Sequence, residues 1–155
     1  MTEWMEYESP AGRLVLTAAE GRLAGVQFAT TEEKTAGNPS EILLQTARWL
    51  DRYFAGEAPD PAEIPVALQG TAFQQKIWAL LREIPYGKTC SYGDLAKRLA
   101  PDRRMSAQAV GAAVGKNPSL ILVPCHRVIG ADGRLTGYAG GVERKQWLLQ
   151  MEGAV

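Results

Sequence analysis

The chain of 155 residues is poor in the side chains that build cross-linked or metal-bound scaffolds, with two cysteines and one histidine. Two cysteines cannot form a disulfide framework, and a four-ligand structural zinc site needs more cysteine and histidine than are present. No stretch reaches the ~18 apolar residues of a membrane span, and the acidic N-terminus is unlike a secretory signal. We therefore expect a cytoplasmic protein with no metal, no cofactor and no membrane partner.

An excess of charge is also missing, because 17 basic side chains balance 17 acidic ones. The balance hides an asymmetry: residues 1–70 carry 5 basic and 11 acidic side chains, whereas residues 71–155 carry 12 and 6. A basic second half is compatible with an anionic partner such as nucleic acid, although an ordinary solvated surface explains the counts alone more simply.

The hydrophobic pattern changes character at a proline-rich segment. Three β-prone runs at 3–8, 13–18 and 22–29 are separated by turn signals, and an amphipathic helix is predicted over 41–54. Residues 57–70 hold three prolines and are predicted to be a linker. The pattern predicts an α/β domain over 1–70, made of a small antiparallel sheet plus a helix. A mostly α-helical domain is predicted over 71–155.

The second half begins with three predicted helices. A capping box at Thr71 begins the first, over 71–84, and serines cap two shorter ones over 91–100 and 106–116. The brief turn 101–105 joins the shorter pair, which makes them a helix-turn-helix candidate. The last helix of the pair consists mainly of alanine and glycine. Either a partner approaches its backbone closely, or it packs tightly on a neighbouring helix.

The remaining sequence predicts a buried strand, a glycine-rich loop and a final helix. The strand is Leu120–Val123, the loop spans 136–141 and the helix spans 142–152. The helix is expected to turn three side chains inward: Trp147, Leu148 and Met151.

Chemical reactivity concentrates at Cys125 and His126, which are neighbours in the segment PCHR. A thiol beside an imidazole suggests a nucleophile and its base, because the thiolate is the reactive form. Adjacent residues of a strand point to opposite faces, so the pair needs a turn or a bridging water to interact. A small buried hydrophobe and a core imidazole are equally good explanations of the two residues taken alone. The other thiol, Cys90, is expected only to pack.

Several longer stretches carry a family resemblance: FQQKIW, IPYGKTCSYGDLA, AVGAAVGKNP, ILVPCHRVIG, GRLTGYAGG and ERKQWLL. Through them, residues 71–152 closely resemble the DNA-binding and active-site domain of the O6-alkylguanine-DNA alkyltransferases, also called methylated-DNA–protein-cysteine methyltransferases. PCHRV is that family's signature around its acceptor cysteine. Residues 1–70 resemble the family's variable N-terminal α/β domain more loosely.

The resemblance implies direct DNA repair by a protein that reacts once. An alkyl group would move irreversibly from O6-alkylguanine, with O4-alkylthymine as a second candidate substrate, in a base flipped out of duplex DNA. It implies that Cys125 accepts the alkyl group, that His126 removes the thiol proton through a water, and that Glu152 orients the histidine. Tyr92 would give a proton or hydrogen bond to guanine, and Asn117 would brace the turn that carries the cysteine.

The resemblance also implies where the base and the DNA lie. The base pocket would involve Val128, Tyr138, Ala139 and Gly140, and Ala139 stands where many relatives have serine. The family enters the minor groove with the second helix of its helix-turn-helix, which fits the small residues here. The expected DNA contacts on and around this helix are Gly93, Ala107, Gln108, Ala109 and Gly111, together with three basic residues: Arg103, Arg104 and Lys116.

One DNA-facing position departs from the family pattern. Relatives usually fill the gap left by the flipped nucleotide with an arginine, and the aligned residue here is Gln108. Our hypothesis is that Gln108 fills the gap while Arg104 supplies charge nearby. We expect a monomer. Two other classes stay open: a non-catalytic module that binds alkylated DNA, and an ordinary helix-turn-helix regulator.

Overall fold

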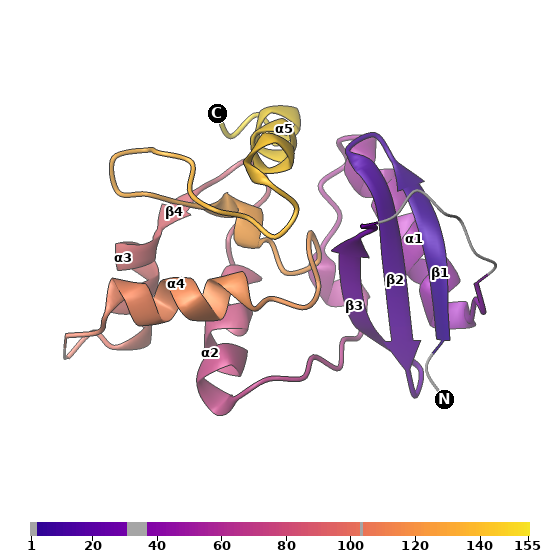
Figure 1. Cartoon of the computed structure of the whole chain (residues 1–155), viewed down its shortest axis with the longest axis horizontal. Helices are drawn as coiled ribbons and strands as arrows, with labels where there is room; N and C mark the ends of the chain where they lie inside the picture. Colours follow the sequence, from indigo (N-terminus) through magenta and orange to yellow (C-terminus); the bar gives the residue numbers. More distant parts are fainter. Residues whose placement is uncertain (1–2, 31–36, 103) are drawn as a thin grey trace. The chain divides into compact units, whose positions relative to one another are not determined.

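The computed structural model describes residues 3–30, 37–102 and 104–155. The chain forms two compact units, Met1–Gln69 and Gly70–Val155 (Figure 1). Within the described residues, no helix is both long and apolar enough to cross a membrane.

As far as its residues are described, the first unit is a three-stranded antiparallel meander covered by one helix. The strands β1 (Glu3–Ser9), β2 (Gly12–Ala19) and β3 (Arg22–Phe28) lie in that order, and α1 (Glu41–Phe54) contacts all three. Tight turns at glycines with positive φ join the strands. The predicted small sheet and helix are therefore confirmed.

The core of this unit lies between the sheet and α1. Alternate residues of β2 point to one face, so Leu14, Leu16 and Ala18 are all fully buried. Side chains of α1 at helical spacing pack against them: Ile42, Leu43, Thr46, Trp49, Leu50 and Tyr53.

The proline-rich segment belongs to the first unit and is hydrogen-bonded to its sheet. It contains the 3-10 turn η1 (Pro61–Glu63), and beyond it the chain pairs with β3. The amide of Leu23 donates to the Pro65 carbonyl at 2.9 Å, and Ala67 donates back to Leu23 at 2.9 Å. Proline lacks an amide donor, but its carbonyl still accepts, so it can occupy the edge of a sheet.

In its described residues, 70–102 and 104–155, the second unit holds four helices and two short strands. In chain order these are α2 (Ala72–Leu81), β4 (Cys90–Ser91), α3 (Tyr92–Leu99), α4 (Ala107–Gly115), the 3-10 turn η2 (Cys125–Arg127), β5 (Val128–Ile129) and α5 (Val142–Glu152). The expected caps at Thr71, Ser91 and Ser106 are all present. Helices α2, α3 and α4 contact one another, and α3 and α4 form the predicted helix-turn-helix.

Two local predictions in this unit are wrong. Residues 120–123 form a tight turn in which Ile121 has φ of +73°, so the apolar run is buried without being a strand. The inward face of α5 also differs, because Trp147 is 36% exposed and Met151 is half-buried. The buried residues of α5 are Lys145, Leu148, Leu149 and Glu152. The prediction took the apolar residues of α5 as its inward face. It was wrong because two of the four buried positions carry charged side chains.

Candidate active site

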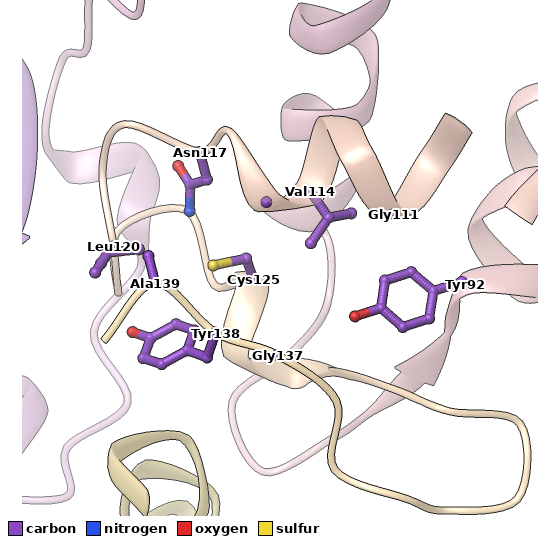
Figure 2. Close-up of a pocket in the computed structure, with 10 residues that line it drawn as sticks. Tyr92, Gly111, Val114, Asn117, Leu120, Cys125, Gly137, Tyr138 and Ala139 are labelled. Carbon is purple, nitrogen blue, oxygen red and sulfur yellow. The ribbon is translucent and has the colours of Figure 1, made fainter. Parts of the chain in front are cut away.

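The backbone turns sharply at Cys125. The amide of Cys125 donates to the Val123 carbonyl at 2.8 Å, and Arg127 donates to the Pro124 carbonyl at 3.0 Å. The resulting 3-10 turn means that Cys125 and His126 do not alternate across a strand. The cysteine side chain is 6% exposed and lies on a small pocket (Figure 2). The pocket is lined by Tyr92, Gly111, Val114, Gly115, Asn117, Leu120, Cys125, Gly137, Tyr138 and Ala139.

A buried ion network joins the other two residues of η2 to the end of α5. The Nε2 atom of His126 lies 2.7 Å from Oε2 of Glu152. Arg127 donates to both oxygens of the same carboxylate, at 2.9 Å and 3.1 Å. The amide of Gly87 adds a further donor to Oε1 at 3.1 Å. A carboxylate with this many donors is fixed in both position and charge.

The environment keeps Glu152 ionised. Burial alone raises its pKa, but the hydrogen bond and charge of His126, together with those of Arg127, lower the pKa of Glu152 to about 2. Burial lowers the pKa of His126, against the opposing pull of Glu152. A neutral imidazole held against a carboxylate is suited to take up a proton, because the carboxylate stabilises the imidazolium that forms.

Cys125 itself is a thiol at neutral pH. Burial raises its pKa to about 11, although a hydrogen bond with Asn117 and the charge of Lys145 act in the opposite direction. The thiolate is the reactive form, so chemistry at this sulfur requires a base to remove the proton during the reaction.

Asn117 holds the turn that precedes the cysteine. Its Nδ2 donates to the Val123 carbonyl at 2.7 Å, and its Oδ1 accepts from the Ser119 amide at 2.9 Å. These bonds close the turn 119–123, in which Ile121 has its left-handed backbone. One side chain therefore ties the end of α4 to the residues directly before Cys125.

Two tyrosines, Tyr92 and Tyr138, also line the pocket. The hydroxyl of Tyr92, at the start of α3, lies 2.6 Å from Oγ1 of Thr136. The ring of Tyr138 packs edge-on to His126 with centroids 6.3 Å apart, and its hydroxyl is buried. Figure 2 shows Tyr92 and Tyr138 on different sides of the cavity next to Cys125. A flat ligand entering the pocket would meet aromatic faces, the small Ala139 and the sulfur.

Helix α4 supports both explanations that its composition left open. One face packs inside the unit through Val110, Ala113 and Val114, and Trp78 donates to the Ala113 carbonyl at 2.9 Å. The first three residues of the helix, Ala107, Gln108 and Ala109, are exposed, and so is Lys116 directly after its end.

Two family models match the chain. The model described as 6-O-methylguanine DNA methyltransferase, DNA binding domain, matches residues 72–154, and the ribonuclease-like domain of the same description matches residues 4–68. A Methanosarcina acetivorans protein named methylated-DNA–protein-cysteine methyltransferase is 42% identical over 153 residues, covering 96% of each chain. A Mycobacterium bovis protein of the same name is 53% identical over 157 residues, covering 98% of this chain and 93% of its own.

The fold gives the same result. The structure of a Mycobacterium tuberculosis protein of this kind in complex with DNA superposes with a TM-score of 0.84 at 40% identity, covering 97% of this chain and 92% of that one. The chain belongs to the O6-methylguanine DNA methyltransferase family.

Several residues expected to contact the base or the DNA do not line the pocket of this methyltransferase. Val128 is buried in β5 and pairs with Cys90, and the Gly140 carbonyl accepts from Arg144 at 3.5 Å. Gly93 and Arg104 line a separate groove between α3 and α4. Arg103 lies outside the described residues.

The methyltransferase site also contains residues that the sequence did not single out. Arg127 donates twice to Glu152, although the sequence gives it no role beside the cysteine. Lys145 is fully buried, and Thr136, in the glycine-rich loop, contacts the Tyr92 hydroxyl. A charged residue on the apolar stripe of α5 was the available signal for Lys145.

Proposed function

We propose that this chain repairs DNA directly by moving one alkyl group from O6 of a guanine to Sγ of Cys125. The observation that carries the proposal is the position of Cys125 on the pocket, followed in η2 by the buried His126 and its bond to Glu152. Alkylated O4 of thymine presents similar chemistry and is a second substrate. The product is a thioether, which has no proton to lose and holds the alkyl group through a stable S–C bond, so each molecule reacts once.

Activation of the sulfur requires removal of its proton. In the proposed mechanism a water between the thiol and the imidazole carries the proton from Cys125 to His126. The imidazolium that forms lies 2.7 Å from the Glu152 carboxylate, which balances its charge. Arg127 and the Gly87 amide hold that carboxylate in place, so Glu152 orients the histidine throughout.

Alkyl transfer is a displacement at carbon. The thiolate forms an S–C bond as the C–O6 bond breaks, and the electron pair of that bond passes into the guanine ring. Tyr92 gives its hydroxyl proton to the ring, which removes the negative charge from the leaving group. Asn117 keeps the sulfur in line by bracing its turn.

The base pocket is assigned mainly to Tyr138 and Ala139, which line the cavity. Val128 and Gly140 do not line this cavity, so a part for them in base binding is proposed from the family resemblance alone. Because Ala139 has no side-chain hydroxyl, its hydrogen bonds with a base must come from the backbone.

A base stacked in duplex DNA cannot reach the sulfur and must rotate out, at a cost of a few kcal/mol. We propose that α4 enters the minor groove, where the small Ala107 and Ala109 allow its backbone to approach. Gln108 then fills the gap, and Arg104 contributes charge. Backbone approach at Gly93 and Gly111 and phosphate contacts from Lys116 and Arg103 complete the proposed interface.

The test is mass spectrometry of the protein after incubation with a duplex that contains O6-methylguanine. We expect a mass gain of one methylene on the peptide that contains Cys125, at one equivalent and no more. Cys90→Ser should gain the same mass, and Cys125→Ser should gain none while the lesion stays in the DNA. DNA binding without mass gain would favour a non-catalytic lesion-binding module, and equal binding to unmodified duplex would favour a regulator.

We also propose that the protein works as a monomer in the cytoplasm. The acceptor must remain a reduced thiol, and cytoplasmic thiols are kept reduced. The substrate of the proposed reaction, the DNA of the cell, is present there.

A further inference from the structure

Arg127 is a buried arginine whose guanidinium group is bonded through all three of its nitrogens. Its Nε and Nη2 donate to the two carboxylate oxygens of Glu152, and its Nη1 donates to the Ile84 carbonyl at 2.7 Å. The ring of Tyr86 lies over the guanidinium, with its centroid 5.7 Å from Cζ. The end of α5 and the turn after α2 therefore hold this group in one place, and an arginine stays positively charged throughout the working range of pH.

The carboxylate that binds Arg127 is also the partner of His126. Oε2 of Glu152 accepts from Nη2 of Arg127 at 3.1 Å and lies 2.7 Å from Nε2 of the imidazole. An ionised carboxylate can only accept hydrogen bonds, so Nε2 carries the ring hydrogen of neutral His126. The proton that His126 takes up in the reaction must therefore be added at Nδ1.

The charges of this cluster are balanced while His126 is neutral. The negative charge of Glu152 and the positive charge of Arg127 then cancel in the buried cluster. Without Arg127 the balance would reverse, because a neutral imidazole would leave the carboxylate uncompensated and a proton from solvent on His126 would compensate it. An uncompensated charge is strongly unfavourable in a protein interior, so the protonated ring would then be the favoured form.

We infer that Arg127 is a positioning residue that keeps His126 neutral, and so able to accept a proton, until Cys125 reacts. This inference rests on the proposed function, in which the thiol proton reaches the imidazole through a water. In that step the thiol becomes a thiolate as the imidazole becomes an imidazolium, so the two new charges appear together and balance each other. A histidine that already carried a proton could not take this one, and the sulfur would remain an unreactive thiol.

The other groups around this cluster either are uncharged or act with Arg127. The titratable and charged groups that face it are Cys125 and Arg127 of η2, Lys145 and Glu152 of α5, Tyr138 of the loop before α5, and Tyr86 of the turn after α2. Burial raises the pKa of the thiol and of both tyrosine hydroxyls, so none of these is charged at neutral pH. Burial lowers the pKa of His126, and the charges of Arg127 and Lys145 act in the same direction, against Glu152. Arg127 is the cation bonded to the carboxylate itself, so its loss should change the imidazole most.

The experiment is an NMR titration of untagged protein labelled at histidine, because His126 is the one histidine in the sequence. We expect the ring of the unmodified protein to be neutral at neutral pH, and Arg127→Met to raise its pKa by about one unit or more. Arg127→Lys keeps the positive charge and should return the pKa most of the way. Arg98→Met is the matched control for loss of one arginine, because Arg98 pairs with Glu83 at the surface.

Glu152→Gln provides a second background in which the same effect must appear. Loss of the carboxylate should lower the pKa of His126, and adding Arg127→Met to Glu152→Gln should raise it again. The double variant buries neither of the two charges, so it keeps the comparison available where Arg127→Met alone does not fold. A histidine pKa that is unchanged or lowered by loss of Arg127, in either background, would overturn the inference.

The single-turnover rate on methylated duplex shows whether this charge matters for transfer. Arg127→Met should be about tenfold slower at neutral pH, since a ring whose pKa lies one unit above the pH is neutral in about a tenth of the molecules. The ratio of the unmodified rate to the variant rate should fall as pH rises through the raised pKa. A structural defect would lower the rate by the same factor at every pH, so a constant ratio would also overturn the inference. The histidine titration needs no alkyl transfer, so failure of the unmodified chain to methylate Cys125 would overturn the proposed function alone.

Discussion

The two units differ in what they bury. Among the described residues, the buried polar side chain of the first unit is Thr46, whose hydroxyl donates back to the Ile42 carbonyl of its own helix. The second unit buries six: Asn117, Ser119, His126, Arg127, Lys145 and Glu152. Both units have apolar cores, so the buried charges of the second are not needed to build a fold of this size. A buried ion network contributes little net stability. The second unit therefore bears the desolvation cost of buried charged side chains, and we attribute their presence to the reaction at Cys125.

The strongest test of this contrast removes the charge at the centre of the network. Glu152→Gln keeps the shape of the side chain but leaves Arg127 buried without a counter-ion. We expect a loss of about 3–5 kcal/mol in the free energy of unfolding. The single-turnover rate at neutral pH should fall about 100-fold, because His126 loses the carboxylate that stabilises its protonated form. Urea denaturation and transfer to methylated duplex measure the two effects.

Acid titration provides a control for the same substitution. The pKa of Glu152 falls from its ordinary 4.5 to about 2 on folding, so the unfolded chain binds a proton there that the folded chain does not. This contribution to stability is present above pH 4.5 and is lost as pH falls towards 2. The stability of the unmodified protein should therefore decline more steeply over this window than that of Glu152→Gln. Equal slopes would show that Glu152 is not held ionised.

A second test asks whether stability can be lost from the first unit without any loss of chemistry. Leu16 is fully buried on β2, and Leu16→Ala should cost about 2–5 kcal/mol of stability. The transfer rate should be unchanged at temperatures where the variant is folded. Leu148→Ala is the matched variant in α5, where Leu148 is also fully buried, one turn before Glu152. It should lower both stability and rate, and a rate loss for Leu16→Ala of similar size would remove the contrast.

The same contrast explains how much of the fold could be predicted from the sequence. In the first unit the apolar period and the turn glycines specify the strands and α1 directly. In the second unit the capping serines and Thr71 specify the helix starts just as well. The prediction was wrong on the inward face of α5, where Lys145 and Glu152 occupy core positions. Hydrophobic periodicity assigns charged residues to the exposed face of a helix. It therefore cannot identify a buried face on which charged side chains form part of the active site.

The site was predictable to the extent that its residues lie in a recognisable motif. Cys125 and His126 are adjacent, and a thiol next to an imidazole suggests a nucleophile and its base from the sequence alone. The role of Glu152, by contrast, was predicted only from the family resemblance. Thr136 accepts from Lys145, nine residues later in the chain, and its hydroxyl also contacts that of Tyr92, 44 residues earlier. Contacts between such distant positions depend on how α3, η2 and α5 pack, and no local pattern reports them.

The smallest expected effects lie on the exposed face of α4, where no buried charge is involved. Gln108→Ala should slow transfer a few-fold, because alanine cannot fill the gap left by a flipped base, and Arg104→Ala should act less strongly. The Arg104 variant should also bind duplex more weakly and with a smaller salt dependence. With one phosphate contact fewer, binding releases fewer counterions from the DNA. Transfer kinetics and binding at two salt concentrations measure both effects. Gln108→Arg, which restores the residue usual in the family, should match or exceed the unmodified rate. Near-normal rates for both alanine variants would show that neither side chain stabilises the extruded base.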